Sequence, residues 1–169
     1  MALDVAQLMK MSQAQLDELF RNNPAGDIPR GEGEGTVIID PGTELTDVAA
    51  KFAHIFAWQG KVFDPETGQL CNKILPPGIR AIIANVYKGK SWFDERECIV
   101  IDYSKTSLVA HWIRDEIREV APGLYLGIVF WDENKLINFA WLFLKHEGRC
   151  KWQRAINLKR DAGDFPYSI

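Results

Sequence analysis

The feature that most constrains the fold is a series of short apolar or alternating runs, separated by turn residues, that starts at Trp58. Such runs are typical of β-strands joined by hairpins. The predicted strands are 59–64, 69–74, 79–88, 97–103, 124–131 and 136–145. With 36–40 and a strand inside 107–120 the total is roughly eight, a number that can close into a small antiparallel barrel with room for side chains or one ligand.

Segment 107–120 fits two kinds of structure equally well. A strand within it places alternate residues on one face, and a helix buries residues at a period of 3.6. The strand face consists of Val109, His111, Ile113, Asp115, Ile117 and Glu119. The helix face consists of Leu108, Val109, Trp112, Ile113, Ile117 and Val120. The strand alternative matters more for function, because it directs His111 and Asp115 to the same side as three aliphatic residues.

The N-terminal part of the chain is predicted to carry helices. Ser12 and Gln15 form a capping box, which predicts a helix over 12–21. A second, longer helix is predicted after Asp40–Thr43, because apolar residues recur at helical spacing over 45–56.

Between these helices, Gly31–Gly35 reads G-E-G-E-G. A phosphate-binding loop needs a basic residue and a following helix, whereas here Glu32 and Glu34 intervene and a strand follows. The segment is therefore interpreted as a flexible lead-in or as the first narrow strand of a barrel.

The composition describes one soluble domain. A chain of 169 residues with 47% hydrophobic and 25% charged residues is of single-domain size. We expect helical decoration and a first strand in 1–57, barrel strands in 58–150 and an outer strap in 151–169. The net charge of −3, with no Lys/Arg cluster among the aromatics, disfavours nucleic-acid binding. No run has the length of a signal peptide or membrane span, so we expect a cytoplasmic protein without membrane contact.

The three cysteines, Cys71, Cys98 and Cys150, are odd in number and far apart. They lack the spacing of a metal site, so reduced and half-buried thiols are expected, with no metal and no cofactor.

The run from Trp58 to Lys145 contains several short motifs in a characteristic order. They are W-Q-G-K-V-F (58–63), L-C-N (70–72), V-Y-K-G-K-S (86–91), V-I-D-Y (100–103), I-R-D-E-I-R-E-V (113–120), L-Y-L-G (124–127) and F-A-W-L-F-L (139–144). In order and approximate spacing they resemble the uncharacterised GxWxG family with its companion C-terminal domain, over about half the chain. The family's opening motif corresponds at best to Gly31–Gly35, where Gly or Glu stands in place of Trp.

That resemblance implies a mainly β, lipocalin-like or calycin-like antiparallel barrel. It also favours a strand over 113–120, with Pro122-Gly123 turning it into the next strand. It implies no established activity.

Asp115 and His111 are the candidate catalytic residues. A carboxylate among inward aliphatic side chains is costly to bury unless it is paired, and such groups concentrate at functional sites. Arg114, Arg118 or His111 is a candidate partner, and a solvated salt-bridged face is the plain alternative. His111 would serve as a general base oriented by Asp102 or Asp115, or it is a structural or surface histidine.

The candidate ligand-binding residues are Arg118, Tyr103, Tyr125, Trp112 and Asp102. Asp102 and Tyr103 end an apolar strand and so lie at a barrel rim, where Tyr103 or Tyr125 would donate a hydrogen bond to a ligand or simply fill the core. Trp112 belongs to a set of tryptophans large enough to line a cavity, although most of them have to fill the core. Lys61 is expected to be an exposed strand lysine, with attraction of a ligand carboxylate as the alternative.

Three functions fit these features. The first is binding of one small, largely apolar or aromatic molecule in a barrel pocket. The second is a cofactor-independent isomerase, cyclase or decarboxylase that uses His111 or Asp115 for proton exchange. The third is an assembly module with a filled barrel, which would use the apolar strand 136–144 in a homodimer contact.

Overall fold

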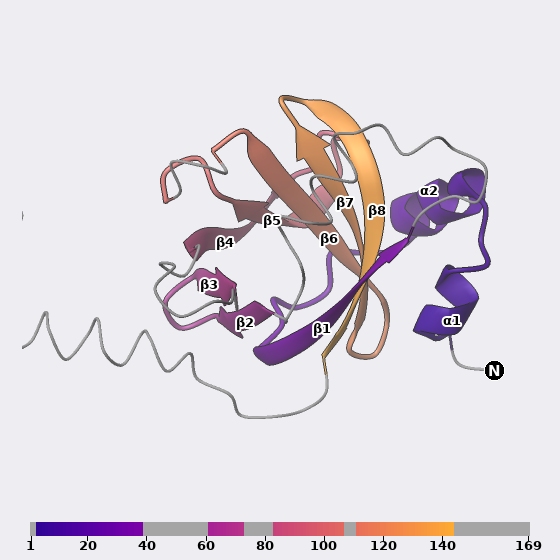
Figure 1. The fold of residues 1–169 in the computed structure, drawn as a ribbon, viewed down its shortest axis with the longest axis horizontal. Helices are drawn as coiled ribbons and strands as arrows, with labels where there is room; N and C mark the ends of the chain where they lie inside the picture. Colours follow the sequence, from indigo (N-terminus) through magenta and orange to yellow (C-terminus); the bar gives the residue numbers. More distant parts are fainter. Residues whose placement is uncertain (1–2, 39–60, 73–82, 107–110, 144–169) are drawn as a thin grey trace, which may run out of the picture.

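A computed structural model describes residues 3–38, 61–72, 83–106 and 111–143. Eight strands and two short helices are present in this part of the chain (Figure 1). The helices are α1 (Val5–Leu8) and α2 (Gln13–Asn22). The strands are β1 (Gly31–Ile38), β2 (Lys61–Asp64), β3 (Gln69–Asn72), β4 (Ile83–Lys90), β5 (Glu97–Asp102), β6 (Ile113–Ala121), β7 (Leu124–Trp131) and β8 (Asn134–Phe143).

The strands form one closed antiparallel barrel. Each strand pairs with the next one along the chain, and β8 closes the barrel by pairing with β1 from Gly33↔Phe143 to Ile38↔Asn138. The prediction of a mainly β, eight-stranded antiparallel barrel with N-terminal helices is thereby confirmed. Closure gives every strand two neighbours, so the barrel has no open sheet edge.

The glycine-rich segment Gly31–Gly35 is the beginning of β1, so the barrel-strand interpretation is correct and the flexible lead-in is not. Glycine is needed at Gly33, because a Cβ atom there would lie 2.5 Å from the ring of Phe143 on the neighbouring strand β8. The narrow strand thus leaves room for an inward aromatic ring.

Segment 113–121 is a strand, which settles the ambiguity between strand and helix for this part; residues 107–110 lie outside the described residues. β6 pairs with β5 on one side and with β7 on the other. Because side chains alternate along a strand, Ile113, Asp115 and Ile117 share one face, and Arg114, Glu116 and Arg118 share the other.

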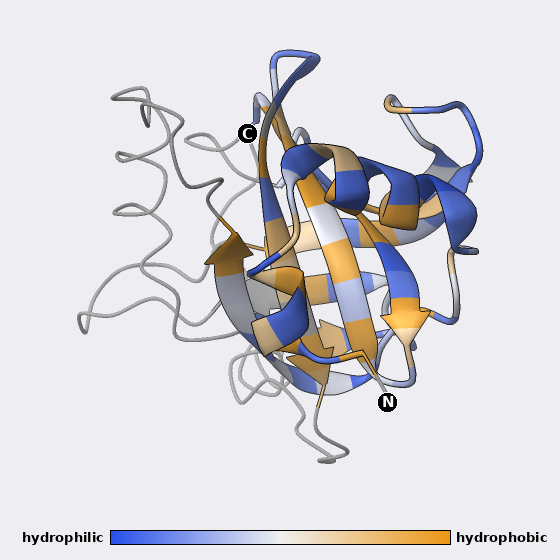
Figure 2. Cartoon of the chain, turned by 90° about the vertical axis from the view of Figure 1, so that its right-hand side faces the viewer, coloured by the Kyte–Doolittle hydropathy of each residue, from blue (hydrophilic) through white to orange (hydrophobic). Residues whose placement is uncertain are grey.

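The buried apolar residues form two clusters, one inside the barrel and one outside it. The inner cluster takes residues from all the strands after β1, among them Phe63, Val86, Ile101, Ile117 and Phe139. The outer cluster contains helix residues such as Leu8, Leu16 and Phe20 together with strand residues such as Val100, Leu126 and Ala140. The helices therefore cover one outer face of the barrel, as Figure 2 shows.

Both helices begin at a capping box. Ser12 and Gln15 start α2, which confirms the predicted helix to within one residue at each end. Asp4 and Gln7 form the same reciprocal contact at α1, a short helix that the sequence analysis missed although the D-x-x-Q signal is present. The predicted helix over 45–56 and the strap over 151–169 lie outside the described residues. Neither described helix is long and apolar enough to cross a membrane.

Candidate functional site

Three ionisable side chains meet inside the barrel. They are Lys61 on β2, Tyr103 directly after β5, and Asp115 on β6. The Nζ atom of Lys61 lies 2.7 Å from Oη of Tyr103 and 2.7 Å from Oδ2 of Asp115, and the Tyr103 hydroxyl lies 3.2 Å from the same Oδ2. The three residues are only 1%, 0% and 3% exposed. They form a buried triangle of polar contacts, called here the inner polar cluster.

The position of each member follows from its strand. In the closed strand order β2 and β6 are four places apart, so they lie on opposite walls of the barrel. Lys61 shares the inward face of β2 with Phe63, and Asp115 shares the inward face of β6 with Ile113 and Ile117. The long lysine side chain therefore crosses the interior to reach the opposite wall.

The apolar surroundings determine the electrostatics of the inner polar cluster. Burial lowers the pKa of Lys61 below its usual value, while the attraction of Asp115 and its hydrogen bond partly oppose that shift. Loss of the ammonium proton is thus easier than in a solvated lysine. A neutral amine next to a carboxyl group can accept a proton, act as a nucleophile, or bind an acidic ligand group.

The expectation of an exposed Lys61 is wrong. The residue lies two positions before Phe63, so the alternation of a strand places both on the inward side. The motif W-Q-G-K-V-F contained this signal, since an inward Phe63 implies an inward Lys61. The expectation of an exposed lysine followed instead from the general tendency of lysine side chains to lie at the surface.

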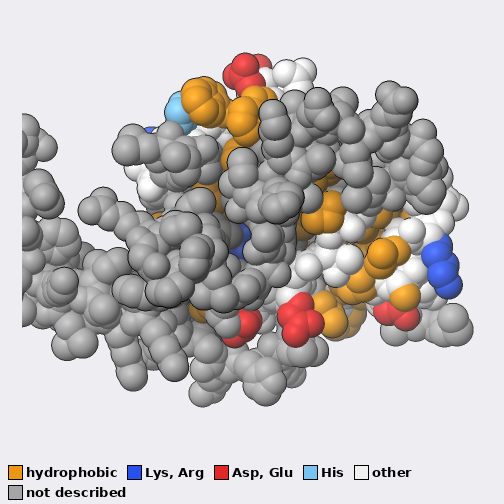
Figure 3. Space-filling view, in the orientation of Figure 1, with side chains coloured by type: hydrophobic (Ala, Val, Ile, Leu, Met, Phe, Trp, Pro, Cys, Tyr) orange, Lys and Arg blue, Asp and Glu red, His pale blue; other side chains and the backbone are white. Residues whose placement is uncertain are grey.

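The structure does not bring His111 and Asp115 together. His111 is exposed in the turn before β6, and its ring centroid lies 3.6 Å from that of Trp112. Trp112 is itself 50% exposed and lies 5.9 Å from Trp131, ring centroid to ring centroid. In the space-filling view a histidine accordingly borders hydrophobic side chains at the upper edge of the molecule (Figure 3). Lys61 occupies the position beside Asp115 that was expected for the imidazole.

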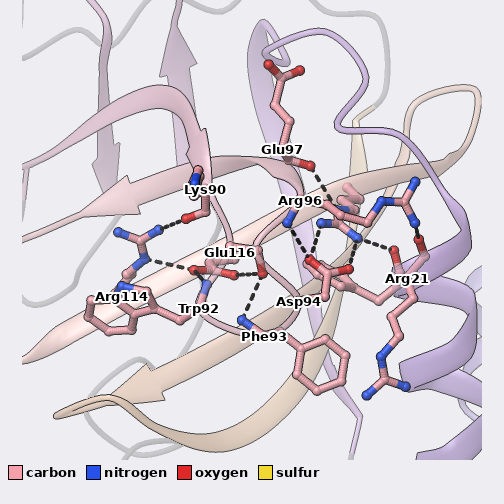
Figure 4. A network of polar contacts seen from close by, with 12 residues as sticks. Arg21, Lys90, Trp92, Phe93, Asp94, Arg96, Glu97, Arg114 and Glu116 are labelled. Atoms are coloured by element: carbon pink, nitrogen blue, oxygen red, sulfur yellow. Dashed lines mark hydrogen bonds and ion pairs between the residues drawn. The ribbon is translucent and has the colours of Figure 1, made fainter.

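Arg118 lies on the opposite face of β6 from Asp115, so the expected pairing of these two residues does not form. Its guanidinium makes two hydrogen bonds of 2.7 Å to Asp94 and also donates to the backbone oxygens of Phe20 and Glu97 (Figure 4). Burial of Asp94 opposes ionisation, but the hydrogen bonds from Arg118 and from the Arg96 backbone lower the pKa of Asp94 overall. Arg118 fastens the end of α2 to the barrel wall.

Glu116 organises the neighbouring part of the same outer face. It accepts hydrogen bonds from the Ser91 hydroxyl at 2.5 Å, the Trp92 backbone N–H at 2.8 Å and Arg114 Nε at 2.8 Å (Figure 4). With Arg118 and Asp94 these residues hold the connection between β4 and β5 against β6. This outer polar network satisfies buried charges and turns, and it is separated from the inner polar cluster by the barrel wall.

Tyr125 and Asp102 also lie apart from the inner polar cluster. The Tyr125 hydroxyl donates to the backbone oxygen of Asp27 at 2.8 Å, and burial, followed by the nearby carboxylates of Glu119 and Asp27, raises its pKa. Asp102 accepts from the Ser104 backbone N–H at 2.8 Å and so shapes the turn after β5. Of the candidate catalytic and ligand-binding residues named from the sequence, Tyr103 and Asp115 meet in the inner polar cluster, whereas His111 and Trp112 contact each other in the exposed turn before β6.

Within the described residues no group of three or more His, Cys, Asp or Glu is placed to hold a metal ion. Cys98 is a free thiol and is fully buried rather than half-buried. Burial, with a smaller contribution from Glu116, raises the pKa of this thiol to about 12. Its thiolate is therefore scarce at neutral pH.

Comparison with known proteins shows the fold alone. No protein-family model matches the chain, and no curated protein matches it. The crystal structure of a protein from Thermomonospora curvata is similar, with a TM-score of 0.58 and 16% sequence identity over 80% of this chain and 89% of that one. The resemblance to the GxWxG family stays a prediction.

Proposed function

We propose that the barrel binds one small, largely apolar or aromatic molecule, with a polar group of that molecule at Lys61, Tyr103 and Asp115. Small-molecule sites combine apolar walls with a few convergent polar groups. The inner cluster of apolar residues supplies the first property, and the inner polar cluster supplies the second. The ion pair that crosses the barrel interior is the observation that carries the proposal.

Stability alone gives a weak reason for such a pair. Replacing a buried ion pair by apolar residues of similar size is often neutral or stabilising, because both charges lose their hydration. The inward neighbours Phe63, Ile113 and Ile117 show which residue types fill this barrel. Buried ionisable groups that contact a specific charge partner concentrate at functional sites, so the contacts of Lys61 with Asp115 and Tyr103 support a ligand site.

The polar atoms define the ligand chemistry. Lys61 and Tyr103 supply N–H and O–H donors, and Asp115 supplies an acceptor. A ligand carboxylate, carbonyl or phenolate oxygen would compete with Asp115 for the N–H groups of Lys61. The aromatic body of the molecule would lie among the inward apolar side chains.

Two measurements test this function together. Native mass spectrometry of the purified protein reports copurified small molecules and subunit number, and the subunit number also tests the homodimer of the assembly-module alternative. Fluorescence titration with 1-anilinonaphthalene-8-sulfonate, an aromatic anion, is expected to saturate, and Lys61→Met should weaken binding at least about tenfold, which is about 1.4 kcal/mol. Arg30→Met, at an exposed residue, is the control and should leave binding unchanged.

The proposal fails if the wild-type protein carries no copurified ligand and binds the probe only with a Kd above about 1 mM, which corresponds to a binding free energy of about −4 kcal/mol. It also fails if Lys61→Met and Arg30→Met bind the probe as the wild type does, because the probe then sits on the surface.

A cofactor-independent isomerase, cyclase or decarboxylase is the second candidate. The specific observation in its favour is the 2.7 Å contact between Lys61 Nζ and Asp115, across which a proton can move without change of net charge. This version of the enzyme uses Lys61 in place of His111. If Lys61→Met abolishes turnover and His111→Ala keeps it, the reaction uses Lys61 with Asp115. The opposite result would favour the His111 and Asp115 pair predicted from the sequence.

A further inference from the structure

We propose that Lys61 forms a reversible imine with an aldehyde or ketone bound inside the barrel, with Asp115 as proton carrier and Tyr103 as hydrogen-bond donor to the carbonyl oxygen. This inference rests on the proposed binding function and names the ligand class more closely. It assigns a covalent site to the inner polar cluster.

The placement of the amine is the first support. Lys61 is the one lysine with a buried side chain among the described residues. Its Nζ atom lies 2.7 Å from a carboxylate oxygen and 2.7 Å from a phenol oxygen, inside an apolar core. Imine formation needs a nucleophilic amine, a group that moves protons and a donor for the carbonyl oxygen, and these three meet within one set of contacts. The lowered pKa of Lys61 agrees with this placement.

Each proton has a defined route. The Lys61 ammonium first gives a proton to Asp115, and the neutral amine then attacks the carbonyl carbon. A C–N bond forms while the C=O π electrons move to oxygen, which takes the proton back from Asp115. Asp115 next accepts a proton from the new secondary ammonium and returns it to the hydroxyl group, which leaves as water as the C=N bond forms.

The overall change joins Lys61 and the carbonyl compound with loss of one water, and no oxidant or reductant is needed. The product is a protonated imine whose positive charge stays beside the Asp115 carboxylate, so the buried charge balance is the same before and after reaction. Exclusion of water from the apolar interior would slow the reverse hydrolysis.

Lys135 provides a matched control within the same chain. Burial also lowers its pKa, and it forms an ion pair with Asp17. It differs in position, because it is half-buried beside α2 near the ring of Phe93, on the outside of the barrel. If a lowered pKa were sufficient for imine formation, Lys135 would react with the aldehyde as fast as Lys61 does.

The experiment treats the full-length protein with 2-naphthaldehyde and sodium cyanoborohydride, which reduces an imine to a stable amine. Peptide mass spectrometry then locates the adduct. We expect one main adduct at Lys61, formed at least about tenfold faster than any adduct at Lys135, and slowed at least about tenfold by Asp115→Asn, since positioned acid–base groups contribute about 100-fold or more. Mapping on the wild-type chain does not depend on the folding of any variant.

A non-reacting analogue separates this inference from the binding function. 2-Naphthalenemethanol has the same aromatic body without a carbonyl group, and it should protect Lys61 from the aldehyde. If the alcohol binds and Lys61 carries no adduct, the imine inference is wrong and the binding function stands. If neither compound binds, both are wrong. Equal labelling of Lys61 and Lys135 would also overturn the inference, because the reaction would then report amine basicity alone.

Discussion

A double-mutant cycle on Lys61 and Asp115 tests the central physical claim, that the barrel holds a buried ion pair it does not need for stability. The variants are Lys61→Met, Asp115→Asn and the double variant. The side chains are 2% and 4% exposed and their charged atoms lie 2.7 Å apart. At an effective dielectric constant of about 20 the attraction is about 6 kcal/mol. The desolvation of two ions, at several kcal/mol each, offsets most of it.

The single and double variants should therefore behave very differently. Each single variant leaves one buried charge without its counter-charge and should lower the free energy of unfolding by about 3–5 kcal/mol. The double variant removes both charges and should lie within about 1–2 kcal/mol of the wild type. The coupling energy between the two positions should accordingly exceed about 3 kcal/mol.

Urea denaturation followed by tryptophan fluorescence and circular dichroism measures these free energies. Arg30 and Glu66 provide the control cycle, because they form an ion pair of 3.0 Å with side chains that are 59% and 60% exposed. Their coupling should stay below about 1 kcal/mol, since water screens exposed pairs. A double variant that is as unstable as the worse single variant would refute the reasoning, as would a Lys61–Asp115 coupling no larger than the control.

Three further predictions follow from single residues. The pKa of Lys61 is lower in the folded protein than in the unfolded chain, so just below pH 10.5 the unfolded chain binds more protons. Lys61 therefore makes the free energy of unfolding rise with pH in that range. This rise should be absent when the free energy of unfolding of Lys61→Met is measured in urea as a function of pH. Cys98 should react with iodoacetamide about 1000-fold more slowly in the native protein than in urea at the same pH, because its pKa is raised from 9.0 to about 12; rapid native labelling mapped to Cys98 would contradict its burial. Gly127→Ala should destabilise the barrel by about 1–3 kcal/mol in urea, because its Cβ atom would lie 2.1 Å from the Phe139 ring, and a neutral result would mean that the ring moves freely.

Much of the fold could be predicted because its signals are local. Turn residues and alternating apolar runs mark the strands, and 124–131 was predicted with its observed bounds. The capping box of Ser12 and Gln15 marks α2. The strand alternative for 113–120 also placed Asp115 on the inward face with Ile113 and Ile117, as the structure has it. Each of these features depends on residues within one segment, either through the alternation of side chains along a strand or through a cap at a helix start.

The partners of the charged residues could not be predicted in the same way. Arg118 appeared to be a neighbour of Asp115 in sequence, but three positions along a strand place it on the outer face, where Asp94 and the end of α2 receive it. His111 precedes the strand and lies in the exposed turn before it. The outer position of Arg118 follows from the alternation of the strand, whereas its partners depend on which elements pack against that face.

The sequence by itself determined the strands, their alternation and the count that allows a barrel to close, because short-range sterics and hydrophobic periodicity act within each segment. Only the tertiary structure decided that Lys61 meets Asp115, 54 positions along the chain and on the opposite wall. Closure of the sheet and the stagger of its strands determine which inward side chains lie at the same height along the barrel axis and so contact one another. That contact is a property of the whole barrel, since no single strand contains it.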